Sequence, residues 1–142
     1  MTRLGSAGQE ITEVSVLELG TGPGASGVTE LGAQAAGAAA ALAPTLPAAV
    51  GQTTWLSGFS VDGLGATAGS VIAVTVTGLL GGTRTYEVTI PAGALLALAP
   101  RLQIEFTRPL PASAPNTAIV LNVPSFGVGN TSAVAELHGF RK

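Results

Sequence analysis

The strongest constraint on the fold is a pair of alternating stretches joined by glycines, between Gly69 and Pro91. Apolar and polar side chains alternate in both stretches, which is the pattern of β-strands with one buried face. The apolar faces consist of Ile72, Val74 and Val76 in the first stretch and of Tyr86, Val88 and Ile90 in the second. The pattern predicts an antiparallel hairpin, which needs further strands to cover its apolar face.

The length of the hairpin loop follows from the parity of this alternation. A two-residue turn of Gly81 and Gly82 would place apolar side chains opposite polar ones, because a slip of one residue moves every side chain to the other face. A three-residue loop of Leu80, Gly81 and Gly82 removes the conflict. The predicted pairs are then Val76 with Tyr86, Val74 with Val88 and Ile72 with Ile90. We expect one glycine of this loop to adopt the left-handed conformation.

Four more stretches with strand character follow at short, even intervals, which is typical of an all-β fold. They are residues 52–61, 101–107, 117–123 and 132–140. The first carries Trp55, Phe59 and Val61 on one face, so we expect much of the aromatic core there. With the hairpin these stretches make six strands. The expected fold is an antiparallel β-sandwich, Ig-like or jelly-roll-like, with about three strands in each sheet.

A change in composition near Gly51 divides the chain into an N-terminal arm, residues 1–50, and a β-sandwich domain, residues 51–142. Within the arm, residues 9–19 read as an edge or added strand, and the glycine-rich residues 20–27 as a loop. The alanine-rich residues 28–42 are predicted to form a short helix that needs a packing partner. Residues 43–50 contain two prolines and are predicted to be an extended linker.

The arm is poor in large apolar side chains, especially after Leu31. Ordering a backbone costs roughly 1–2 kcal/mol per residue, and packing on its own small domain cannot offset that cost along the whole arm. Its acidic residues outnumber the single basic residue, Arg3; they are Glu10, Glu13, Glu18 and Glu30. We therefore expect contacts with neighbouring subunits to hold the arm in place.

The composition favours a protein partner over nucleic acid or membrane. Only 10% of the residues are charged, the mean hydropathy is +0.51 and the net charge is −2, so part of the surface is expected to meet another protein. The basic residues are scattered and form no stripe suited to nucleic acid. The chain has no cysteine, which excludes disulfides and thiolate metal sites. No continuous apolar run follows Arg3, so we expect neither a signal peptide nor a membrane span.

A glycine-rich stretch in the arm matches an enzyme motif. Residues 16–24 read VLELGTGPG and resemble motif I of class I methyltransferases that use S-adenosylmethionine, and residues 22–27 fit the G-x-G-x-x-G pattern of dinucleotide binding. Such folds need a second βα unit with an acidic residue about 20 residues later. That region reads LAPTLPAAV and offers neither. We therefore expect a glycine loop that binds no nucleotide, and a protein without a cofactor.

No other residues form a recognisable catalytic or metal-binding pattern. His138 is the only histidine, no G-x-S-x-G string accompanies it, and it shares a strand face with Glu136 and Phe140, so we expect a surface histidine. The acidic residues are spread singly, without the spacing of a metal or glycosidase site. Asn130 begins a glycosylation sequon, which needs a secretory route. We predict no enzyme activity and assign no catalytic, cofactor-binding or metal-binding residues.

Between Gln52 and Arg141 the turns and strands resemble a recurrent small β-domain of uncharacterised tailed-phage proteins. The stretches that carry the resemblance are GATAGSVIAVTVTGLLGGTRTYEVTIPAGA, PLPASAPNTAIVLNVPSFGVGNTSAV and a closing HGF. The resemblance implies a virion component such as a capsid decoration or cement protein. Such a protein would bind the major capsid protein and neighbouring copies of itself on the phage head surface, as a homotrimer. No catalytic residues come with the resemblance.

Two alternative functions remain open. A tail or receptor-binding module would bind carbohydrate through an exposed aromatic or acidic patch, for which Trp55 and Tyr86 are few. A methyltransferase fragment would bind S-adenosylmethionine. In a cement protein, by contrast, the arm should be buried against the capsid.

Overall fold

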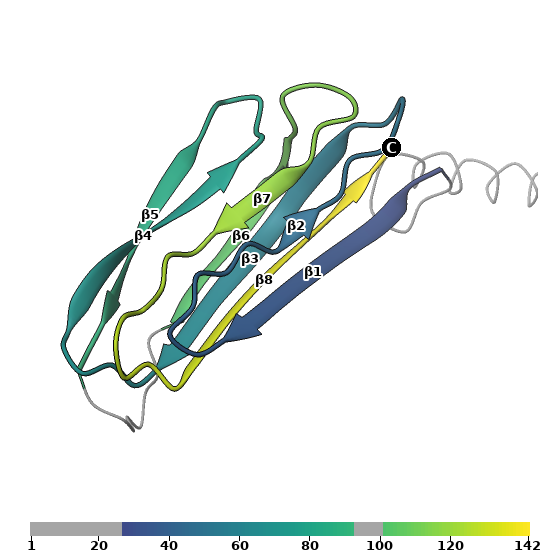
Figure 1. The fold of residues 1–142 in the computed structure, drawn as a ribbon. Helices are drawn as coiled ribbons and strands as arrows, with labels where there is room; N and C mark the ends of the chain where they lie inside the picture. The colour runs from purple at the N-terminus through teal and green to yellow at the C-terminus, as the bar shows by residue number, and fades with distance from the viewer. Residues whose placement is uncertain (1–26, 93–100) are drawn as a thin grey trace, which may run out of the picture.

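The computed structural model describes residues 27–92 and 101–142, and these residues form an all-β fold. Two antiparallel sheets of four strands each face one another (Figure 1). This confirms the predicted antiparallel all-β class, although the described ranges contain eight strands where six were expected. They are β1 (Thr29–Gly37), β2 (Thr45–Leu46), β3 (Thr54–Leu64), β4 (Ser70–Thr77), β5 (Arg84–Ile90), β6 (Arg101–Pro111), β7 (Ile119–Asn122) and β8 (Ser132–Arg141).

The strand order shows how the chain is wound. The first sheet has the order β1-β8-β3-β6 and the second has the order β2-β7-β4-β5. The first strand therefore pairs with the last, the second with the last but one, the third with β6, and β4 with β5. The chain can be described as one long antiparallel ribbon that turns back between β4 and β5. Successive strand pairs of this ribbon lie alternately in the first and the second sheet.

One core lies between the sheets and takes buried side chains from both of them. On β3 these are Leu56, Phe59 and Val61, each at most 1% exposed. Sequence alternation placed Trp55 on the same face as Phe59, and this prediction is wrong. A β-bulge between Leu56 and Gly58 shifts the alternation by one residue. Leu56 therefore faces the core, and Trp55 stacks on Phe140 outside it.

The helix predicted for residues 28–42 is also wrong, because most of this stretch is strand β1. It pairs antiparallel with β8 along all 9 of its residues, and Leu31, Ala33 and Ala35 pack against the core from alternate positions. Two glycines each weaken a helix by about 1 kcal/mol, whereas the edge of β8 supplies a complete hydrogen-bonding partner. Pairing with β8 therefore outweighs the helical preference of alanine.

The predicted linker, residues 43–50, also contributes to the fold. It contains β2, which pairs with β7, and Leu46 of β2 is 0% exposed. Strands β1 and β2 both precede Gly51, so the two sheets include part of the chain that the sequence assigned to the arm. The strand predicted for residues 9–19 and the loop up to residue 26 lie outside the described residues.

The β4–β5 hairpin has the predicted faces but a different register. Val76 pairs with Arg84, Val74 with Tyr86 and Ile72 with Val88, so β5 is displaced by two residues and the apolar face is preserved. The loop is longer than expected because Leu79 is buried and bridges to Ala112 after β6. Gly82 adopts the expected left-handed conformation, with φ of 84°.

Candidate functional site

The second sheet is split at one end. β4 pairs with β5 along residues 70–76, but its other neighbour, β7, pairs with it only at residues 75–77. Beyond β7, the backbone of Val123 exchanges hydrogen bonds with Leu42 at 2.8 and 2.9 Å. Pro124 follows and has no N–H group with which to continue a ladder. Among the described residues, the first half of β4 therefore has no strand beside it on this side.

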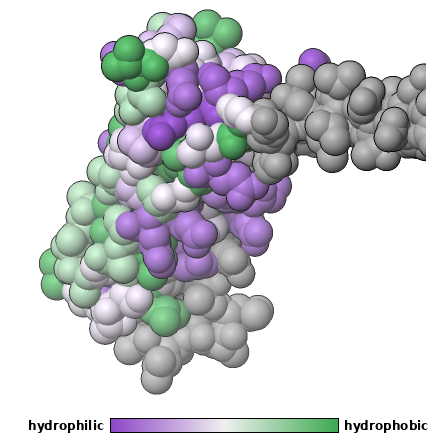
Figure 2. All heavy atoms as spheres, turned by 90° about the vertical axis from the view of Figure 1, so that its right-hand side faces the viewer, coloured by the Kyte–Doolittle hydropathy of each residue, from purple (hydrophilic) through white to green (hydrophobic). Residues whose placement is uncertain are grey.

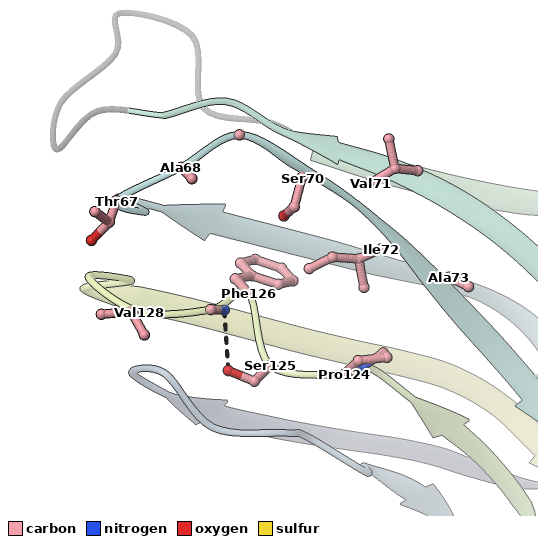
Figure 3. A pocket seen from close by; sticks show the side chains of 12 residues that line it. Thr67, Ala68, Ser70, Val71, Ile72, Ala73, Pro124, Ser125, Phe126 and Val128 are labelled. Carbon is pink, nitrogen blue, oxygen red and sulfur yellow. Dashed lines mark hydrogen bonds between the residues drawn. The ribbon is translucent and has the colours of Figure 1, made fainter.

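The split forms a groove of about 700 Å³, which we call the β4 groove (Figure 3). One wall is the first half of β4, the other wall is the loop between β7 and β8, and the connection from β3 closes one end. Binding pockets in proteins commonly measure about 300–1,000 Å³, so the groove can accept a ligand or a short extended peptide. Its lining residues are 67–73 and 124–128, none of which is charged.

Apolar side chains form both the floor and the rim of the β4 groove. Ile72 and Phe126 lie next to each other at the floor and are 6% and 2% exposed (Figure 3). Gly63 of β3 makes room for the Phe126 ring, because a Cβ at this glycine would clash with it. Val71 and Val128 stand on opposite walls and are 62% and 81% exposed. Large apolar side chains exposed together around one hollow favour an apolar partner.

One buried asparagine holds the loop wall of the groove in place. Asn130 is 5% exposed. The N–H of Ala39 donates to its Oδ1 at 2.8 Å, and its Nδ2 donates to the carbonyl oxygens of Leu64 and Ser132, also at 2.8 Å. Its side chain thus ties the loop to the end of β3 and to the corner between β1 and β2. Because this side chain is buried and fully hydrogen-bonded, Asn130 serves the fold and does not present the surface amide that a glycosylation sequon requires.

The outer face of the first sheet, which we call the polar face, has a contrasting character. Hydrophilic residues gather on the side of the molecule where β1 lies (Figure 2). The strand register places one polar row across all four strands. It consists of Gln34, Glu136, Ser60 and Gln103. The molecule therefore offers a polar sheet surface and, in the other sheet, an uncharged groove.

His138 lies on the polar face, on the same side of β8 as Glu136, as its alternation predicts. Its side chain contacts Glu105. Its Nε2 is 3.0 Å from Oε2 of the glutamate, and the two side chains are 44% and 56% exposed. Gly58 separates the two residues in the sheet, and a Cβ there would clash with the Glu105 carboxylate. The glycine thus allows the side chains to meet across β3. An exposed pair of this kind contributes about 0–1 kcal/mol to stability.

Trp55 and Tyr86, the residues considered for a sugar-binding platform, lie in different sheets. The Trp55 ring stacks on Phe140 with centroids 6.0 Å apart and planes 5° apart, and Nζ of Lys142 lies 5.4 Å from its centroid. Tyr86 belongs to β5 and meets Phe59 edge-on, with centroids 5.1 Å apart. The two aromatic side chains therefore do not form one platform.

The β4 groove was not predicted from the sequence. The available signals were Pro124 directly after a strand and the uncharged start of β4 next to a glycine-rich turn. The glycine motif of residues 16–24 lies outside the described residues and stays a prediction. Within residues 27–92 and 101–142, no three acidic or histidine side chains gather as a metal site would need. That same part of the chain contains no helix long and apolar enough to span a bilayer.

No protein-family model matches the sequence, and a search of curated proteins finds no match either. Function therefore has to be inferred from the fold and from the two surfaces described above.

Proposed function

We propose that the protein is a structural component of a tailed-phage particle, of the capsid decoration or cement type, built on a jelly-roll β-sandwich. Eight strands wound as one ribbon into two four-stranded sheets support a jelly roll rather than the Ig-like alternative. Jelly rolls recur in viral capsid domains. This support is an analogy of fold, and it agrees with the resemblance in residues 52–141.

The observation that carries an assembly role is the β4 groove. A free strand edge lined by exposed Val71 and Val128 is an aggregation hazard in a protein without a partner. In a particle, a partner covers such a surface permanently. The resemblance in residues 52–141 implies a place on the phage head surface, with the major capsid protein and neighbouring copies as partners in a homotrimer, and the groove offers a surface for such contacts. The part of the arm that precedes β1 adds a tethered second contact, which raises the overall affinity through effective concentration.

A carbohydrate-binding module of a tail or receptor-binding protein is the second candidate, because jelly rolls also include lectins and the polar face offers hydrogen-bonding side chains. Stacking of Phe140 on Trp55 occupies part of the ring surface that a sugar would need, so we favour assembly. A methyltransferase fragment is the third candidate. Its fold requires parallel strands joined by helices, whereas the described strands are antiparallel.

The test is binding to phage heads. Purified full-length protein is mixed with heads from which it has been removed, and the pelleted heads are examined by quantitative electrophoresis and cryo-electron microscopy. We expect saturation at a fixed number of copies per head, with added density at threefold positions. Binding to a glycan array together with no binding to heads would favour the second candidate and contradict the first.

A further inference from the structure

The β4 groove combines a free backbone edge with apolar walls. We propose that it receives residues 9–19 of a neighbouring copy as an added strand beside β4. The inference rests on the proposed assembly function, because it names the partner of the same groove. It identifies that partner as a second copy of this chain.

The backbone of β4 supplies the first reason. In an antiparallel sheet, successive residues direct their N–H and C=O groups alternately to the two neighbouring strands. β5 takes one side along residues 70–76, whereas β7 takes the other side only at residues 75–77. Alternate residues in the first half of β4 therefore direct peptide groups into the groove without a ladder partner in the described chain. An extended segment can satisfy these groups by strand addition.

A comparison with the edge strands β5 and β6 gives the second reason. Charged side chains on an edge strand discourage pairing with another chain. The edge strand β5 carries Arg84 and Glu87, and the edge strand β6 carries Glu105 and Arg108. Residues 70–74 read SVIAV and carry no charge, and Val71 is 62% exposed. This half-edge lacks the charges that protect β5 and β6 and is suited to pairing.

The sequence of the arm fits the groove. Residues 9–19 read QEITEVSVLEL, and their apolar side chains lie on both strand faces. A strand in this groove meets apolar residues on both of its faces, with Ile72 and Phe126 at the floor and Val71 at the rim. The uncharged centre VSVL lies between Glu13 and Glu18. It matches the uncharged lining, and the two carboxylates remain at the ends in water.

The geometry of β1 indicates that the donor is another copy. β1 begins at Thr29, which pairs with Arg141 near the C-terminus, and β1 runs from there toward the other end of its sheet (Figure 1). The groove lies near the far end of β1, because Asn130, next to the groove-lining residues 124–128, accepts a hydrogen bond from the N–H of Ala39 just after β1. A strand of this length spans about 30 Å. Residues 20–28 would have to run back almost fully extended over that distance. A neighbour placed head to tail brings its arm directly to the groove. Such heterologous contacts close into a ring when the rotation permits, which suits a trimer.

The test uses the purified full-length protein and measures its mass by size-exclusion chromatography with light scattering over a range of concentrations. In the groove, Val71→Glu adds a charge next to the free edge. Val50→Glu is the matched control, because Val50 is 87% exposed and does not line the groove. In the arm, Val16→Pro removes an N–H group from the donor strand, and Ser6→Pro is the control outside it. Circular dichroism verifies that each variant keeps its strands.

We expect a single closed multimer for the unchanged protein and for both controls. Val71→Glu and Val16→Pro should each raise the concentration of half-assembly at least tenfold, equivalent to about 1.4 kcal/mol. A monomeric unchanged protein would overturn the inference, and so would assembly that survives either variant. If only Val71→Glu dissociates the multimer, another segment occupies the groove. If only Val16→Pro does so, the arm binds elsewhere. No phage head is involved, so failure here leaves the head-binding test unaffected.

Discussion

Leu46 tests directly whether the chain before Gly51 belongs to the core. Its side chain is 0% exposed, although it lies on the two-residue strand β2 in a stretch that reads as a linker. Its Cδ1 lies 3.1 Å from the place that a Cβ on Gly139 would occupy. Gly139 belongs to β8 of the opposite sheet. The leucine therefore fills the space between the two sheets at a point where β8 carries no side chain.

The substitution Leu46→Ala should cost about 2–3 kcal/mol of unfolding free energy. Leucine-to-alanine changes in protein cores cost about 2–5 kcal/mol, and the cost is smaller where the surroundings can close the cavity. β2 pairs with β7 through only two residues, Thr45 and Leu46, so it can move inward and we place the cost in the lower half of that range. Small domains are stable by about 5–15 kcal/mol in total, so the loss is readily measured.

Urea unfolding followed by the fluorescence of Trp55, the single tryptophan, measures this cost. The midpoint should fall while the slope with urea stays constant. Val50→Ala is the matched control, because Val50 is 87% exposed and surface changes usually stay within about 0.5 kcal/mol. If Leu46→Ala costs no more than this control, residues 43–50 act as a linker and the assignment of β2 to the core is refuted.

Three further outcomes are expected. Asn130→Ala should lower stability by about 1–3 kcal/mol in a thermal melt, because it removes the three hydrogen bonds that this buried amide makes, whereas Ser125→Ala, at an exposed position of the same loop, should have little effect. Gly58→Ala should cost about 1–3 kcal/mol in urea, because its Cβ would lie 2.7 Å from the carbonyl oxygen of Ile104, whereas Glu105→Ala should cost less than about 1 kcal/mol. Calorimetric titration with S-adenosylmethionine or NAD should give no heat of binding, and saturable micromolar binding would reverse our view of residues 16–24.

The hairpin shows which parts of the fold local pattern can predict. Alternation separated the apolar and polar faces of β4 and β5 correctly, because the side-chain period of a strand is fixed by its geometry. The predicted register was wrong by two residues. A shift of two residues keeps every side chain on the same face, so the alternation of apolar and polar residues cannot detect it. The cause is Leu79, which leaves the hairpin to bridge with Ala112 and lengthens the loop. That contact joins residues far apart in the sequence, so turn residues alone cannot reveal it.

The helix predicted for residues 28–42 was wrong for a related reason. Alanine favours a helix in isolation, but the outcome depends on whether β8 offers a free edge, which is known only once β3 and β8 have paired. The core position predicted for Trp55 was wrong because of the bulge before Gly58, where one extra residue exchanges the inward and outward faces of β3. The β4 groove depends on where β7 stops relative to β4. In each case a tertiary contact decides between conformations that local sequence leaves close in energy.

The poor alternation of residues 9–19 takes on a different meaning beside the β4 groove. In a strand with one face in water, apolar side chains on both faces are a defect, and this stretch therefore reads as a weak edge strand. A strand inserted between the apolar floor and the apolar rim of a groove needs apolar side chains on both faces. Natural sequences depart from local rules mainly at functional sites. If residues 9–19 are added as a strand beside β4 of a neighbouring copy, the pattern that makes them a poor edge strand in their own sheet is the pattern that suits them to the groove of the neighbour.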